Sequence, residues 1–241
     1  MTGIANATRI QLPAIASNRS APVSTYSRRD LLLGATMTAV TMTARAAAPR
    51  FDIDRFVEDC KQANRAHAHA EAQSAVGEIF ARAISNPKAV LQAVGPPERG
   101  GLRTLYRSTN LTILNIVWSP LMQLVPHEHK MWSLIGIYTG REDNIFWQRR
   151  DGRLAATSAS AISPGTVVPL SDDVIHSVAN PTEKLTGAIH IYGGDFFAVE
   201  RSEWDPETLA ERDWDIQRAV RTFNESNDRF FGWQKGERCA R

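Results

Sequence analysis

The pattern of hydrophobic positions divides the chain into a helical part, a part of short strands and a second helical part. Between residues 51 and 85, hydrophobic residues recur at steps of three and four, which is typical of α-helices with one buried face. Asn86-Pro87 ends the second helix of this part, because the residue before a proline disfavours the helical conformation. We expect a short third helix through 91–94 and a loop at the glycines and prolines of 95–101.

After this loop, short segments rich in β-branched and aromatic residues alternate with turn residues. The expected strands are 111–118, 131–138, 144–149, 166–170, 174–178 and 186–192. Many short strands at such spacings predict a sandwich or a barrel. Beyond them we expect a helix with Asp205 as N-cap and Pro206 as its first residue. The prediction is a single domain over 49–241, with a helical lead-in over 51–96, a barrel over about 103–200 and a helical tail over 205–228.

The composition is that of an ordinary globular protein. Of the 241 residues, 43% are hydrophobic and 22% are charged, which excludes a disordered chain, a collagen-like repeat and a coiled coil. The formal net charge of +2 is unevenly distributed, because the first 48 residues carry five arginines and one aspartate. The rest of the chain therefore has a small excess of acidic residues. A nucleic-acid-binding domain is normally clearly basic, so we expect no nucleic-acid partner.

Residues 1–48 have the order of features of an export signal. A polar, acid-free stretch precedes Arg28-Arg29, a mildly apolar run follows over 31–43, and residues 44–48 contain two small-x-small cleavage patterns. The paired arginines resemble a twin-arginine signal, which predicts a periplasmic protein. The apolar run is too short for a membrane span of roughly 20 residues. A disordered tail and an organellar transit peptide are the alternatives, with organellar or cytoplasmic location. In the periplasm, Cys60 and Cys239 are able to pair.

Histidines are the candidate chemistry of the strand region. His127 and His129 are separated by one residue, so on a strand both imidazoles face the same side, while Glu128 faces the other. His176 lies on a later expected strand. Three imidazoles on one face of a small barrel would bind a divalent cation and leave coordination positions open. Open positions are more typical of a catalytic metal site than of a structural one.

The spacing of these residues is similar to the two motifs of the cupin superfamily. The first motif has H-x-H, a glutamate and a glycine, and the matching residues here are His127, His129, Ser133 in place of the glutamate, and Gly140. The second motif is matched at its intervals by Gly165, Ser171, Asp173, His176 and Asn180. The resemblance implies a mainly β fold, the cupin double-stranded β-helix or jelly-roll barrel, with N-terminal helices and a C-terminal helix.

Without the glutamate, the three histidines resemble the site of the thiol dioxygenases, the group of cysteine dioxygenase and mercaptopropionate dioxygenase. The H-x-H-x-x-W stretch that ends at Trp132 is similar to the bacterial branch of that group. Residues 188–192 match its Ser-His-Tyr set through His190 and Tyr192, with Ala188 in place of the serine. The run 189–196 looks typical of an uncharacterised branch of predicted metal-dependent enzymes.

This resemblance implies an iron-dependent dioxygenase that oxidises a small thiol to its sulfinate with O₂. Fe(2+) would be held by the three histidines, with no organic cofactor. His190 and Tyr192 would orient O₂ or bound substrate as catalytic residues. Trp132 would line the pocket, and Arg107, or Arg103 near it, would hold a carboxylate of the substrate.

Ser133 and Ala188 depart from the pattern of the thiol dioxygenases and leave other functions open. One alternative is a cupin enzyme of another reaction type that uses Mn, Ni or Zn. The other is a non-catalytic periplasmic cupin that binds a metal or a small molecule. The sequence predicts neither the identity of the substrate nor the oligomeric state.

Overall fold

Three helices open the part of the chain that the computed structural model describes, residues 50–239, with side chains to residue 232. They are α1 (Ile53–Ala66), α2 (His69–Ile84) and α3 (Pro87–Val94). The side chain of Asp52 caps α1 by accepting a hydrogen bond from Arg55 N, and Asn86 caps α3 by accepting one from Ala89 N. The predicted helical lead-in is therefore confirmed, and Pro87 starts α3 at the first helical position.

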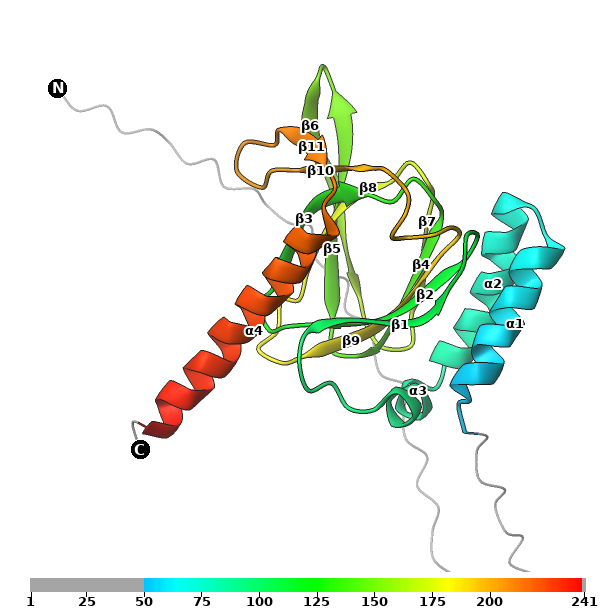
Figure 1. Ribbon diagram of the computed structural model, residues 1–241, viewed down its shortest axis with the longest axis horizontal. Coiled ribbons are helices and arrows are strands. Elements are labelled where there is room, and N and C mark those ends of the chain that lie inside the picture. The colour runs from blue at the N-terminus through cyan, green and yellow to red at the C-terminus, as the bar shows by residue number, and fades with distance from the viewer. Residues whose placement is uncertain (1–49, 240–241) are drawn as a thin grey trace, which may run out of the picture. The chain divides into compact units, whose positions relative to one another are not determined.

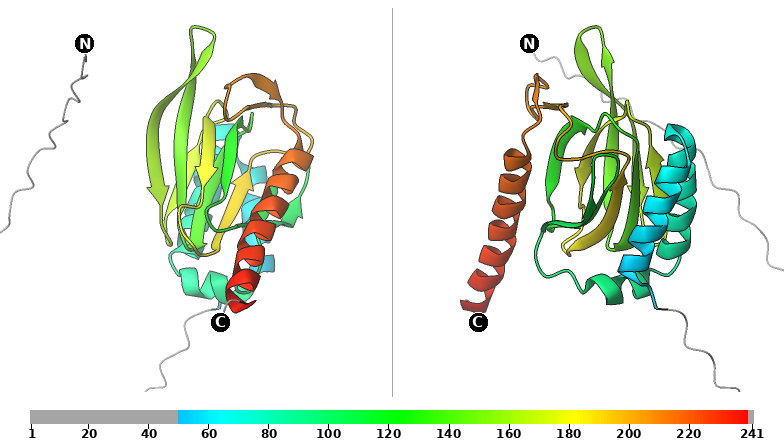
Figure 2. Two further views of the ribbon diagram at one scale, coloured as in Figure 1. Left: turned by 90° about the vertical axis from the view of Figure 1, so that its left-hand side faces the viewer. Right: turned by 45° about the vertical axis from the view of Figure 1, so that its right-hand side comes forward.

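Two antiparallel sheets follow, and Figure 2 shows them facing each other. The first sheet has the order β1 (Gly101–Arg107), β2 (Thr112–Trp118), β9 (Thr186–Tyr192), β4 (Ser133–Thr139), β7 (Val167–Leu170). The second has the order β11 (Glu211–Asp213), β10 (Ser202–Trp204), β3 (Gln123–Glu128), β8 (Ile175–Ala179), β5 (Glu142–Arg150), β6 (Arg153–Ile162). Strands distant in sequence pair with each other, β2 with β9 and β3 with β8, as in a jelly roll. The predicted fold class is confirmed.

The N-terminal helices cover the outer face of the first sheet (Figure 1). Phe80 of α2 lies directly on Gly136 of β4, where an added Cβ would come within 2.3 Å of the ring. Ile189 and Ile191 of β9 belong to this outer core. The residues that alternate with them, His190 and Tyr192, face the interior of the barrel. Strand alternation thus separates the packing residues of β9 from its candidate chemical residues.

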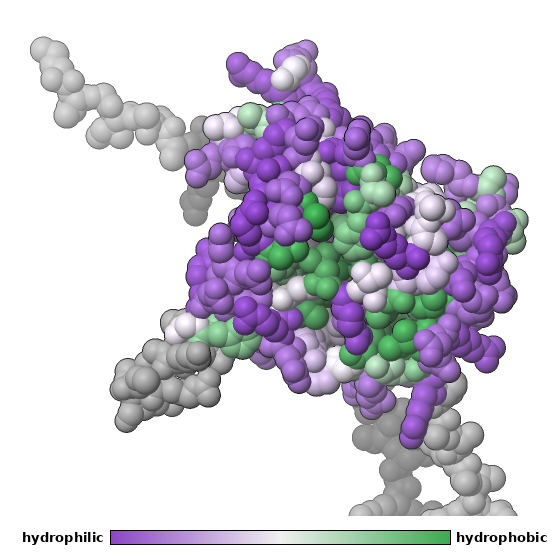
Figure 3. Space-filling view, viewed as in Figure 1, coloured by the Kyte–Doolittle hydropathy of each residue, from purple (hydrophilic) through white to green (hydrophobic). Residues whose placement is uncertain are grey.

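The C-terminal helix α4 (Ile216–Cys239) lies against the barrel, where Phe223 stacks on Trp118 with ring centroids 5.3 Å apart. Asn227 accepts a hydrogen bond from Gly100 N at 2.8 Å, which ties the helix to the start of β1. In Figure 3, hydrophobic side chains gather in the middle of the face that Figure 1 shows, with hydrophilic ones around them. Within the described residues, the helix therefore packs on the barrel as part of the same domain.

Two local differences from the expected elements have physical reasons. The tail helix begins at Ile216 and not near Asp205, because the chain first forms the β10–β11 hairpin. The side chain of Asp205 accepts hydrogen bonds from the backbone N–H groups of Glu207 and Thr208. These are the hydrogen bonds expected of an N-cap, but here they stabilise a turn. The expected strands also left out β1, β3, β6, β10 and β11, and the alanines and serines of β6 lack the side chains typical of strands.

No helix of the described part is long and apolar enough to cross a membrane. The predicted export signal over 1–48 lies outside the described residues, as does the side chain of Cys239. Cys60 is fully buried in α1. A disulfide between these two cysteines stays a prediction.

Candidate metal centre

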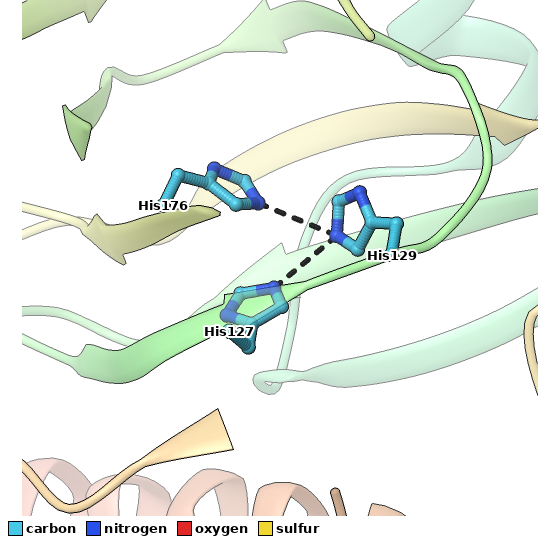
Figure 4. A group of neighbouring side chains, drawn as sticks. All are labelled: His127, His129 and His176. Carbon is cyan, nitrogen blue, oxygen red and sulfur yellow. Dashed lines mark hydrogen bonds between the residues drawn. The ribbon is translucent and has the colours of Figure 1, made fainter. Parts of the chain in front are cut away.

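The three histidines predicted from the sequence meet inside the barrel. Strands β3 and β8 are paired so that His127 stands opposite His176, and His129 follows directly after β3. Figure 4 shows the three rings turned toward one another. The Nε2 atom of His129 lies 3.2 Å from that of His127 and 3.3 Å from that of His176. All three side chains are buried, and their ligand atoms lie within 4.8 Å of one another.

Each of these imidazoles has an oxygen atom at its other nitrogen. Nδ1 of His127 donates to the carbonyl oxygen of Val125 at 2.9 Å, and Nδ1 of His176 donates to Oδ1 of Asn144 at 2.6 Å. Nδ1 of His129 lies 3.2 Å from the hydroxyl of Ser133. A proton held on Nδ1 leaves the lone pair of Nε2 free, and this arrangement is usual around histidines that ligate a metal.

The histidines are uncharged at neutral pH. Burial lowers the pKa of His127 to about 4 and holds the pKa values of His129 and His176 well below the usual range. Mutual repulsion among the three rings adds to the effect of burial. The Nε2 lone pairs of His127 and His176 therefore face one small volume, and the lone pair of His129 joins them when its proton is on Nδ1. A cation there would bind all three nitrogens.

The geometry fits a metal ion. Metal–nitrogen bonds of about 2.0–2.1 Å place two nitrogen ligands of a tetrahedral ion roughly 3.3 Å apart. The two short Nε2 separations, 3.2 and 3.3 Å, match that value. Buried neutral imidazoles with oxygen partners behind them are also a suitable donor set for divalent transition metals.

No carboxylate joins this cluster among the described residues. Ser133, which stands where the cupin motif has a glutamate, contributes only its hydroxyl to His129. Glu128 faces away, as predicted, and pairs with Lys130 at 2.9 Å and Arg149 at 3.4 Å. Three neutral ligands leave the charge of a bound cation uncompensated, so the site would favour an anionic ligand.

His190 and Tyr192 lie on the facing sheet, close to the histidine cluster. Nδ1 of His190 lies 3.2 Å from the hydroxyl of Tyr192, and both side chains are buried. The ring of Tyr192 meets His129 edge-on, with ring centroids 5.0 Å apart. Burial raises the pKa of Tyr192, so the phenol keeps its proton. The structure brings this pair to the site, and its catalytic role stays a prediction.

Glu142 is a site residue that sequence reasoning missed. This carboxylate of β5 has no solvent exposure and accepts three hydrogen bonds. Its Oε2 accepts from Trp118 Nε1 at 2.7 Å and from His190 Nε2 at 3.2 Å. Its Oε1 accepts from Asn144 Nδ2 at 3.0 Å. Glu142 is thus the hydrogen-bond partner of Nε2 of His190. Ala188, which stands in place of the serine of the Ser-His-Tyr set, has no hydroxyl to offer.

Arg201 is the second residue that was missed. Its guanidinium is buried between the rings of Phe196 and Trp214, 4.4 and 4.7 Å from their centroids. Burial lowers its pKa to about 10, so it stays positively charged at neutral pH. One nitrogen, Nη1, donates to the carbonyl oxygens of Phe196 and Val199. Nε and Nη2 have no hydrogen-bond partner among the described residues.

The three residues considered for substrate contact lie elsewhere. The guanidinium of Arg107 forms two hydrogen bonds with Asp195, at 2.9 and 3.0 Å, and is about half exposed. Arg103 is exposed and donates to the carbonyl oxygen of Val94. Trp132 packs in the outer core against Gly193, where an added Cβ would come within 2.1 Å of the indole. None of the three lines the cavity at the histidines. Their roles in substrate binding stay predictions.

That cavity is small and mostly apolar. Its volume is about 20 Å³, room for roughly one water molecule. Its lining includes the histidine cluster, Tyr192, Phe196, Trp214 and side chains of α4. The aromatic lining must move before anything larger than water reaches the Nε2 atoms.

Solved structures that are similar to this chain match part of it only. No family model matches the chain. A cupin-family protein with a double-stranded β-helix fold from Methanocaldococcus jannaschii matches 42% of this chain and 86% of its own, with 13% identity and a TM-score of 0.36. The strand order of the two sheets is by itself that of a jelly roll.

Two oxalate decarboxylases are also similar to part of this chain. The Bacillus subtilis protein is 18% identical over 42% of this chain, with a TM-score of 0.34, and the Lactobacillus farciminis protein is 16% identical over 41%, with a TM-score of 0.33. The match spans 27% and 30% of the length of those proteins. Likenesses this weak assign no reaction, and the fold assignment rests on the strand order of the chain itself.

Proposed function

We propose that the protein is a metal-dependent oxidoreductase, an iron(II) dioxygenase that oxidises a small thiol to its sulfinate. The observation that carries the proposal is the convergence of three buried, neutral Nε2 atoms without a carboxylate. Fe(2+) held by His127, His129 and His176 would bind the thiol as its thiolate and bring O₂ to it. Both oxygen atoms of one O₂ enter the product, so that RSH and O₂ give RSO₂H with no further reductant.

The protein's own residues supply the surroundings of this reaction. Besides the three histidines of the cluster, His190 and Tyr192 contribute polar groups to a cavity whose remaining lining is largely apolar. Because Nε2 of His190 donates to Glu142, its Nδ1 accepts the proton of the Tyr192 hydroxyl. The oxygen of Tyr192 keeps its lone pairs for a ligand next to His129. We propose that this oxygen orients bound substrate or O₂.

The environment of Arg201 favours a substrate thiol that also carries a carboxylate. A buried guanidinium with two unused N–H-bearing nitrogens is suited to bind a carboxylate through paired hydrogen bonds. The rings that enclose it, Phe196 and Trp214, also line the cavity at the histidines. We propose Arg201, rather than the exposed Arg107, as the group that binds the substrate anion.

The test is an oxygen-uptake assay on protein loaded anaerobically with Fe(2+), using a panel of small thiols with and without a carboxylate. We expect one O₂ consumed per thiol and a sulfinate identified by mass spectrometry. If no thiol raises O₂ uptake above the rate of free Fe(2+), the dioxygenase proposal is wrong even where metal binds. Metal binding without turnover would then favour the non-catalytic cupin, and a different native metal would favour another reaction type.

The place of this reaction in the cell is a separate proposal. We propose that the signal over 1–48, with its Arg28-Arg29 pair, exports the folded protein to the periplasm. N-terminal sequencing of protein from the periplasmic fraction should give a start within 45–49. A full-length chain that stays in the cytoplasm would contradict it.

A further inference from the structure

A single buried carboxylate connects the histidine cluster with the tyrosine side of the cavity. We propose that Glu142 is a positioning residue that sets the tautomers of His176 and His190 through its hydrogen bonds. Its consequence for metal affinity rests on the metal site proposed above, whereas the tautomers themselves do not. The inference follows from which atoms are able to donate and which only accept.

The first connection runs from Glu142 to a histidine of the cluster. A carboxylate only accepts hydrogen bonds, so the atom of Asn144 that lies 3.0 Å from Oε1 must be its amide nitrogen. The amide oxygen of Asn144 then faces Nδ1 of His176, at 2.6 Å. An amide oxygen also only accepts, so His176 carries its proton on Nδ1. Its Nε2 lone pair is left pointing at the Nε2 of His129.

The second connection runs from Glu142 to the tyrosine. Oε2 lies 3.2 Å from Nε2 of His190, which must therefore carry a proton and donate it. In the neutral ring Nδ1 is then an acceptor and takes the hydrogen bond of the Tyr192 hydroxyl. Trp118 Nε1 donates to the same carboxylate oxygen at 2.7 Å and holds it in place. One side chain thus determines which nitrogen is free on two rings in different sheets.

Glutamine has the same size as glutamate and would fill this position equally well. Replacing Glu142 by glutamine therefore tests the hydrogen bonds without creating a cavity. In Glu142→Gln one acceptor becomes an NH₂ group. With its carbonyl kept toward Trp118 and His190, the NH₂ faces Asn144 and forces that amide to turn over. Asn144 then presents its own NH₂ to Nδ1 of His176, and the proton of that ring moves to Nε2. The lone pair that faces the cluster is lost.

The experiment measures tautomers directly, in metal-free protein, by long-range ¹H–¹⁵N correlation spectra of the imidazole rings. We expect His176 to be protonated on Nδ1 in the wild type and on Nε2 in Glu142→Gln. Titration of the same proteins with Co²⁺ should show an affinity lower by roughly 10–100-fold in the variant. The double variant Glu142→Gln/Asn144→Asp should recover both properties, because a carboxylate at position 144 accepts from the introduced amide and from His176 together.

Glu128→Gln is the matched control. It removes another buried carboxylate, one whose charged partners are Lys130 and Arg149 and not an imidazole, and it should leave the tautomers of His176 and His190 unchanged. The inference is wrong if folded Glu142→Gln keeps the wild-type tautomer of His176, or if the double variant fails to restore it. A wild type that binds no divalent metal would instead contradict the proposed function, and the spectra would still decide the role of Glu142.

Discussion

The hydroxyl of Ser133 lies 3.2 Å from Nδ1 of His129, so the side chain of Ser133 holds a histidine of the cluster in position. In Ser133→Ala this buried nitrogen loses its partner. We expect the affinity for a divalent metal to fall by roughly 10-fold or more, because hydrogen bonds behind metal-binding histidines orient them. Calorimetric titration of metal-free protein would measure the loss. Unchanged affinity would show that packing alone orients His129.

Removal of one histidine should empty the site. In His176→Ala we expect the metal content of anaerobically loaded protein to fall from about one ion per chain to near zero, since two imidazoles bind a divalent ion far more weakly than three. Elemental analysis of the desalted protein measures it. His67→Ala is the control, because His67 is exposed and follows α1, away from the cavity. Full metal content in His176→Ala would refute the ligand assignment.

The histidines were predictable because their spacing obeys local rules. Side chains two apart on a strand share a face, which placed His127 beside His129 and His190 beside Tyr192. The interval to His176 was predictable from the motif resemblance and not from periodicity. The barrel as a class followed from many short strands with turns between them.

The supporting residues were not predictable in the same way. Asn144 reaches His176 because β5 pairs with β8, and Glu142 of β5 reaches His190 because β9 lies in the facing sheet. No local pattern specifies such contacts between distant segments. Arg201 lies in an irregular segment after β9, where no periodicity indicates that a charged residue is buried. A polar residue next to a turn is usually exposed, and the sequence alone has no signal for these exceptions.

The pKa values of the histidines predict how the site responds to acid. Their pKa values are lowered on folding, so the unfolded chain binds more protons than the folded protein between the usual histidine pKa near 6.5 and about 4 for His127. The free energy of unfolding of the metal-free protein should therefore fall as the pH is lowered through this range, by a few kcal/mol in total.

Denaturant unfolding at several pH values, monitored by circular dichroism, would measure this dependence. A variant with all three cluster histidines changed to glutamine should lose most of it. If the free energy of unfolding stays constant from pH 6.5 to 4.5, the pKa values of the histidines are not lowered on folding, either because water reaches the rings or because the folded protein already holds them protonated.

We expect substitution of Arg201, but not of Arg107, to weaken the binding of a carboxylate-bearing substrate. In Arg201→Met we expect KM for a carboxylate-bearing thiol to rise roughly 10–100-fold, because a hydrogen-bonded pair of charged groups contributes about 1.5–3 kcal/mol. Turnover of a thiol without a carboxylate should change little, since the histidine cluster is untouched. Arg107→Met removes only the half-exposed contact with Asp195 and should leave KM for both thiols near the wild-type value. If Arg107→Met alone raises KM for the carboxylate-bearing thiol, the substrate anion binds at the surface near β1, and the buried guanidinium of Arg201 serves to pack Phe196 against Trp214.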